Sequence, residues 1–172
     1  MLENLTIRVA TETDTALILS FIQGLAEYEK LLHEVVATED SLRESLFGKH
    51  RVAEVVIGEW EQNPVAFALY FYNYSTFLGQ AGIYLEDLYV IPDMRGKGIG
   101  KHMLSYLAGL AKERNCGRLE WSVLDWNEPA LKFYRSIGAV LMDGWTVHRL
   151  TGDALTQLAG ENEGLLTDKQ IN

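Results

Sequence analysis

Hydrophobic positions recur along this chain with two different periods, and their order predicts a mixed α/β protein. Alternating or continuous apolar runs of five to ten residues are typical of strands. Apolar positions three and four apart are typical of helices that bury one face. The predicted strands are Leu5–Ala10, Arg51–Gly58, Val65–Tyr72, Ile83–Ile91 and Arg118–Asp125.

Helical spacing and capping residues predict helices between these strands. Each expected helix begins near a Thr, Gly or Asn and ends near a Gly or an Asn-Cys-Gly sequence, which are start and stop signals. The expected helical segments are 14–26, 38–47, 100–114, 127–137 and a short one at 154–159. Asp143-Gly144 between two apolar runs predicts a final hairpin over residues 140–150. The predicted fold is a mixed, mostly antiparallel sheet flanked by helices.

Length and composition limit what this arrangement can be. A chain of 172 residues is expected to form a single domain over 1–172, with a frayed polar tail at about 160–172. The single cysteine, Cys116, and the absence of a secretory pattern at the N-terminus favour a cytoplasmic protein. No apolar run is long enough to cross a bilayer. A net charge of −9 argues against nucleic-acid binding and favours approach of a cation.

The segment Leu85–Gly100, LEDLYVIPDMRGKGIG, carries the most specific chemistry. A strand, a glycine-rich loop and a helix follow one another, and the free N–H groups of such a helix start suit a pyrophosphate. The loop is not a Walker loop, because Lys101-His102 follows the last glycine, and it is not a dinucleotide fingerprint, because position 103 is Met. The pattern that fits is Arg-x-x-Gly-x-Gly, from Arg95 to Gly100.

With the later segment Trp126–Ala139, WNEPALKFYRSIGA, this loop resembles the GNAT superfamily of N-acetyltransferases. The resemblance implies the GNAT fold and acetyl-CoA as cosubstrate. It implies that Tyr134 protonates the leaving thiolate, since a phenol with a reference pKa of about 10 keeps its proton at neutral pH. The expected coenzyme-binding residues are Leu88, Tyr89, Val90, Arg95, Gly96, Lys97, Gly98, Ile99, Gly100, Lys101, Asn127 and Tyr134.

Within the superfamily, the chain is most similar to the spermidine/spermine N-acetyltransferase branch, which includes enzymes that act on diamines and thialysine. The similar segments are LAEYE, YLEDLYV, RGKGIG, WNEPALKFY and a late Gly-Trp pair. By this resemblance Glu86 and Asp87 bind and deprotonate the amine. In a regular strand the two would point to opposite faces, unless a bulge re-aims one of them. The acceptor site is expected to include Tyr28, Glu29, Glu86, Asp87, Asp143 and Trp145.

The sequence therefore predicts an acetyl-CoA-dependent enzyme that acetylates a small cationic amine by direct attack in a ternary complex. Two alternatives stay open: an N-acetyltransferase for proteins or peptides, and a non-catalytic acyl-CoA sensor. We expect no metal, because the four histidines show no ligand spacing. The branch resemblance also implies a homodimer, and no nucleic acid or membrane partner is expected.

Overall fold

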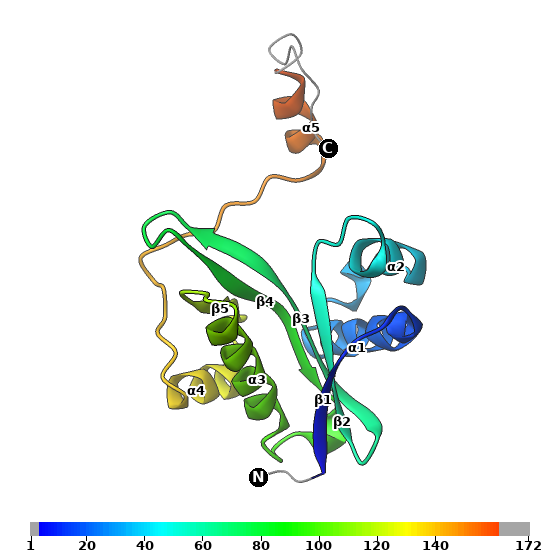
Figure 1. Cartoon of the computed structure of the whole chain (residues 1–172). Coiled ribbons are helices and arrows are strands. Elements are labelled where there is room, and N and C mark those ends of the chain that lie inside the picture. Colours follow the sequence, from blue (N-terminus) through cyan, green and yellow to red (C-terminus); the bar gives the residue numbers. More distant parts are fainter. Residues whose placement is uncertain (1–3, 162–172) are drawn as a thin grey trace. The chain divides into compact units, whose positions relative to one another are not determined.

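The computed structural model describes residues 4–161, and the chain forms two compact units, residues 1–124 and 125–172. The first unit contains a five-stranded sheet in the order β1-β2-β3-β4-β5 (Figure 1). All neighbouring strands are antiparallel except β4 and β5, which run parallel. The strands are β1 (Leu5–Val9), β2 (Glu54–Trp60), β3 (Asn63–Ser75), β4 (Gln80–Val90) and β5 (Leu119–Trp121). The predicted mixed, mostly antiparallel sheet is confirmed.

Helices cover both faces of this sheet (Figure 1). On one face lie α1 (Thr15–Tyr28) and α2 (Glu39–Phe47), and on the other lies α3 (Ile99–Glu113), the crossover between the parallel strands. Thr38 caps α2 by accepting a hydrogen bond from the Ser41 N–H at 3.2 Å. Short 3₁₀ helices, η1 (Glu12–Asp14), η2 (Leu32–Glu34) and η3 (Pro92–Met94), introduce or follow these elements.

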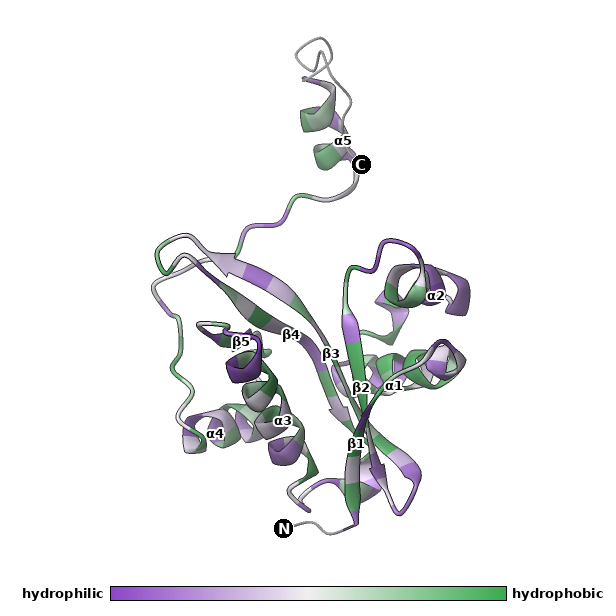
Figure 2. Ribbon diagram, viewed as in Figure 1, coloured by the Kyte–Doolittle hydropathy of each residue, from purple (hydrophilic) through white to green (hydrophobic). Residues whose placement is uncertain are grey.

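The core forms where alternate strand residues meet the helices. Toward α1, Phe67 of β3 stacks on Phe21 with ring centroids 5.5 Å apart, and both rings are buried. Toward α3, the absence of a side chain at Gly58 leaves room for Met103, whose Sδ lies 3.0 Å from where a Cβ would stand. Apolar residues, green in Figure 2, run along β2 and α1. These contacts hold α1 and α3 against opposite faces of the sheet.

The second unit contains α4 (Glu128–Ser136) and α5 (Gly152–Gly160). The predicted turn at Asp143-Gly144 is present, and the Trp145 N–H donates to the Met142 carbonyl at 3.2 Å. The strands predicted on either side of it are wrong, because residues 139–150 hold no strand. A two-stranded hairpin is marginal alone, and no strand occurs between residues 125 and 161 to pair with it.

Several predicted boundaries shift in the structure. The turn between β2 and β3 shrinks to Glu61 and Gln62, both with positive φ, and Pro64 joins β3. The strand predicted at 118–125 covers only Leu119–Trp121. Residues 162–172 of the predicted tail lie outside the described residues. Over residues 4–161, the helices are too short or too polar to span a bilayer.

Candidate active site

A β-bulge interrupts β4 at the acidic pair. Leu69 of β3 pairs with Asp87 and the next residue, Tyr70, pairs with Leu85, so Glu86 has no opposite residue in β3. The extra residue reverses the alternation of side chains along β4. Asp87 shares the α1 face with Phe67 and Tyr89, whereas Leu85 shares the α3 face with Tyr70. The bulge therefore turns Asp87 toward α1 and leaves Glu86 exposed.

Beyond the bulge, one edge of β4 is open. β5 pairs with β4 only from Ile83 to Leu85. The Ile91 N–H donates to the Val65 carbonyl at 3.0 Å, so the backbone groups of Val90 point away from β3. The backbone groups of Leu88 also point away from β3, whereas those of Tyr89 point toward it. Of the three residues predicted to hold the acetyl end of the coenzyme, Leu88 and Val90 direct backbone groups to the open edge.

The glycine loop connects this edge to the start of α3. Gly96 and Gly98 have φ of +74° and +85°, a left-handed conformation that glycine adopts without strain. Gly98 is the N-cap of α3, and the first-turn N–H groups of Ile99, Gly100 and Lys101 have no carbonyl within the helix to pair with. A Cβ on Gly96 would meet nothing within 4 Å. These unpaired backbone donors, next to two glycines that place no side chain over the loop, fit the pyrophosphate of coenzyme A.

Three carboxylates gather where α1 ends beside the bulge. Burial, followed by the charges of Glu86 and Glu29, raises the pKa of Asp87 to about 6. Burial also raises the pKa of Glu29, which is the C-cap of α1. Like charges that cannot move apart disfavour ionisation, so a bound cation would stabilise this cluster. Asp87 therefore lies close enough to Glu86 and Glu29 to feel both charges, and the amine-binding role predicted for these residues stays a prediction.

The side chain of Arg95 does not extend along the loop but contacts two tyrosines beside the acidic cluster. Its Nε donates to the Val90 carbonyl at 2.9 Å. Its guanidinium lies 4.5 Å from the ring centroid of Tyr28 and 5.4 Å from that of Tyr89. The Arg95 N–H donates to the Pro92 carbonyl, so it is not one of the free donors of the loop. The other basic residue of the loop, Lys97, directs its Nζ to Met94 Sδ at 3.2 Å.

The remaining predicted residues belong to the second unit. Asn127 is buried and caps α4 by accepting from the Ala130 N–H at 3.3 Å. Tyr134 is half-buried on α4, and its ring lies 5.4 Å from that of Phe133. Asp143 and Trp145 are exposed at the turn after α4. The roles predicted for these four residues stay predictions.

Gly24 contributes to the site in a way that the sequence pattern did not predict. A Cβ on Gly24 would lie 2.6 Å from the phenol oxygen of Tyr89. Glycine therefore lets α1 approach β4 closely enough to bring Glu29 near Asp87. A lone glycine within a helical pattern was the available signal, because it lowers helix stability unless close packing requires it.

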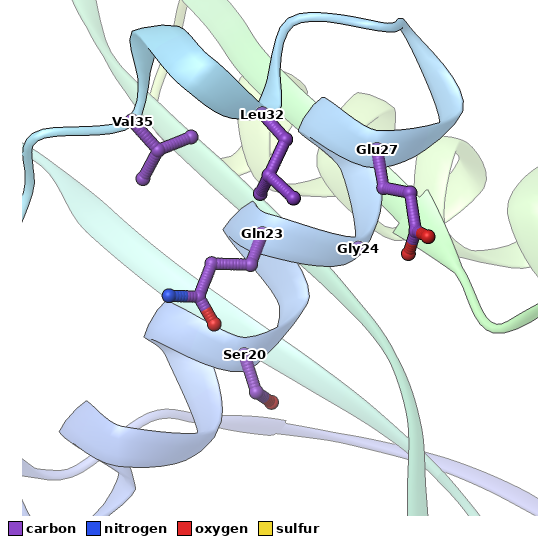
Figure 3. A pocket seen from close by; sticks show the side chains of 6 residues that line it. All are labelled: Ser20, Gln23, Gly24, Glu27, Leu32 and Val35. Atoms are coloured by element: carbon purple, nitrogen blue, oxygen red, sulfur yellow. The ribbon is translucent and has the colours of Figure 1, made fainter.

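A surface groove of about 610 Å³ runs along the outer side of α1 (Figure 3). Ser20, Gln23 and Glu27 line it from successive turns of α1, and Leu32 and Val35 line it from the following segment. Gly24, which backs onto Tyr89, also belongs to its lining. Among the described residues, no group of His, Cys, Asp or Glu has the geometry of a metal site.

Comparison with known proteins places this geometry in a family. Residues 22–139 match the family model described as "Acetyltransferase (GNAT) family". A thialysine N-epsilon-acetyltransferase from Bos taurus is 41% identical over 166 residues, which cover 90% of this chain and 97% of that protein. An L-ornithine N5-acetyltransferase from Arabidopsis thaliana is 32% identical and covers 87% of this chain and 85% of its own length.

A solved structure shows the same fold. An integron cassette protein from the mobile metagenome of V. cholerae superimposes with a TM-score of 0.77 and 28% identity, covering 91% of this chain and 98% of its own. The match to the family model begins within α1, at residue 22, and includes the bulged β4, the glycine loop and α4. This chain belongs to the GNAT acetyltransferase family and is an N-acetyltransferase, which acetylates an amine with acetyl-CoA as cosubstrate.

Proposed function

We propose that the protein acetylates a small cationic amine: a polyamine, a diamine or a lysine-like amino acid. The observation that carries this proposal is the proximity of Asp87 to Glu86 and Glu29, whose negative charges act on the Asp87 carboxyl and would attract a cation. Two relatives are named for transfer to the side-chain amines of thialysine and ornithine, which are small basic amino acids. Their chemistry matches what such a cluster would attract.

Each group in the first unit has a distinct part in this proposal. Gly96, Gly98 and the first turn of α3 hold the pyrophosphate, and the Leu88 and Val90 backbone groups hold the pantetheine arm and polarise the acetyl carbonyl. The amine binds as an ammonium against the carboxylates and must lose a proton before it can attack. Asp87 accepts that proton, because its raised pKa lies close to neutral pH.

Transfer then follows directly within a ternary complex. The amine nitrogen forms a bond to the acetyl carbon while the carbon–sulfur bond breaks, and Tyr134 donates its phenolic proton to the departing thiolate. Tyr28 and Glu29 form one wall of the acceptor site, and Asp143 and Trp145 line it as the family resemblance implies. Asn127 contributes to the binding of the pantetheine chain. We propose no covalent enzyme intermediate and no metal.

A panel of amines with acetyl-CoA, read as released thiol, tests the acceptor class. We expect turnover with diamines, polyamines or thialysine, and its loss in Glu29→Gln and Asp87→Asn. The control Glu113→Gln makes the same charge change at an exposed residue at the far end of α3 and should behave as wild type. Acetylation of peptides alone would favour a protein acetyltransferase. Coenzyme binding without any turnover would favour a sensor.

We also propose a homodimer, as the branch resemblance implies, and a cytoplasmic location, which the single cysteine favours. Exposed Tyr74 and Phe77 near the turn that joins β3 to β4 supply apolar surface for such an association. Sedimentation of the full chain at micromolar concentration should give twice the monomer mass of 19.4 kDa. Sedimentation at the monomer mass would contradict the dimer.

A further inference from the structure

Arg95 joins two parts of the molecule that the proposed function assigns to different substrates. It belongs to the loop that precedes α3, which would hold the coenzyme. Its side chain, however, stacks on Tyr28 at the end of α1, next to Glu29 of the acceptor carboxylates. One side chain therefore spans the border between the two sites.

Both ends of Arg95 are fixed. Its backbone N–H bonds to the Pro92 carbonyl at 3.1 Å, and its Nε bonds to the Val90 carbonyl at 2.9 Å. The guanidinium plane is then held near two rings, at 4.5 Å from Tyr28 and 5.4 Å from Tyr89. Of these two rings, Tyr89 is buried, but 36% of Tyr28 is exposed. Tyr28 is therefore the more accessible of the two rings that the Arg95 guanidinium contacts.

We propose that Arg95 is a positioning residue that couples coenzyme binding to acceptor binding by holding Tyr28. The inference rests on the proposed function. A shift of the loop on binding a pyrophosphate also moves Arg95, and Arg95 passes that shift to the ring next to Glu29. Coupling of this kind is reciprocal, so a change at Tyr28 must also alter the affinity for the coenzyme.

The contact requires an arginine rather than any cation. A guanidinium can stack on a ring and donate through Nε at the same time, whereas a lysine ammonium is a point charge without a plane. A cation over an aromatic ring at a partly exposed site typically changes affinity by roughly 3- to 10-fold. That is the range in which we expect the coupling to appear.

Calorimetric titration of the full chain with coenzyme A tests the link without turnover. Tyr28→Leu removes the ring, and we expect it to weaken coenzyme A binding by roughly 3- to 10-fold. Tyr28→Phe keeps a ring beneath the guanidinium and should retain the wild-type affinity for coenzyme A. Arg95→Lys removes the planar group that stacks on Tyr28, and we expect it to raise the acceptor KM with a smaller change in kcat. The double variant Arg95→Lys/Tyr28→Leu should bind coenzyme A no more weakly than the weaker single variant.

A second arginine–tyrosine pair supplies the matched control. The Arg114 guanidinium lies 5.6 Å from the Tyr72 ring at the opposite end of α3. Tyr72→Leu removes the same type of ring contact, together with the hydrogen bond that Arg114 donates to the Tyr72 phenol at 2.7 Å, and should leave coenzyme A affinity unchanged. Wild-type affinity in Tyr28→Leu would overturn the proposal, as would equal weakening in Tyr72→Leu. If the wild type binds coenzyme A but acetylates no amine, the proposed function fails, while the titrations of the Tyr28 variants still decide the link.

Discussion

Replacing Asp87 with asparagine removes a carboxyl group whose ionised form is disfavoured by its surroundings. The pKa of Asp87 is raised from 3.8 to about 6 because the side chain is buried and lies near Glu86 and Glu29. The interval between these two values, at about 1.4 kcal/mol per pH unit, corresponds to roughly 3 kcal/mol. The folded protein bears this cost whenever Asp87 is ionised.

The sign of the pH dependence follows from which state holds the proton more tightly. Below about pH 4 the carboxyl is protonated in both the folded and the unfolded chain, and there is no cost. Between about pH 4 and 6 the unfolded chain ionises first, so the free energy of unfolding of the wild type falls as the pH rises. Above about pH 6 both states are ionised and the cost stays constant.

Asp87→Asn should therefore be more stable than the wild type at about pH 7.5, by up to roughly 3 kcal/mol, and the two should converge near pH 4. Urea denaturation across this range measures the difference. Glu113→Gln, at an exposed residue, should show no such divergence. A variant less stable than the wild type at neutral pH, or a difference that does not change with pH, would refute the reasoning. In the wild type, the acceptor kcat/KM should rise as the pH increases through about 6, and Glu113→Gln should show the same rise.

Three further substitutions test other parts of the site. Tyr134→Phe should lower kcat by at least roughly tenfold and leave coenzyme A affinity within a factor of about two, measured by steady-state kinetics and calorimetry. Gly98→Ala places a Cβ at φ +85°, which costs about 1–2 kcal/mol, so calorimetry should show weaker coenzyme A binding. Gly24→Ala would set a Cβ 2.6 Å from the Tyr89 phenol oxygen, and thermal unfolding should show a loss of about 1–3 kcal/mol of stability.

Local patterns in the sequence were sufficient to predict most elements of the first unit. The helix after the glycine loop was predicted at 100–114 and is observed at Ile99–Glu113, because its apolar spacing and stop signal lie within the segment itself. The strand before the loop was predicted for the same reason. Such patterns indicate which residues of a segment are buried, and in these two segments the spacing of the buried residues matches the helix and the strand that form.

Features that depend on pairing between strands could not be predicted in the same way. The bulge at Glu86 arises from register against β3, and LEDLYV contains no glycine or proline that would mark it. The hairpin predicted at 140–150 failed because alternation indicates a potential strand but supplies no partner for it. The sequence also predicted that Arg95 adds positive charge to the loop, but it did not predict which residues its side chain contacts. The contact with Tyr28 joins segments far apart in the chain.

The unpaired residue in β4 has a consequence for moving this segment between proteins. Between Leu85 and Val90, the number of residues matters as much as their identity. The extra residue, Glu86, determines to which face of the sheet each following side chain of β4 points. If the same six letters were grafted into a strand with regular pairing, Asp87 would share a face with Leu85, on the side opposite to α1. The segment therefore cannot be transferred to another protein by its sequence alone. A graft must include the neighbouring strand, β3, whose pairing with β4 contains the bulge.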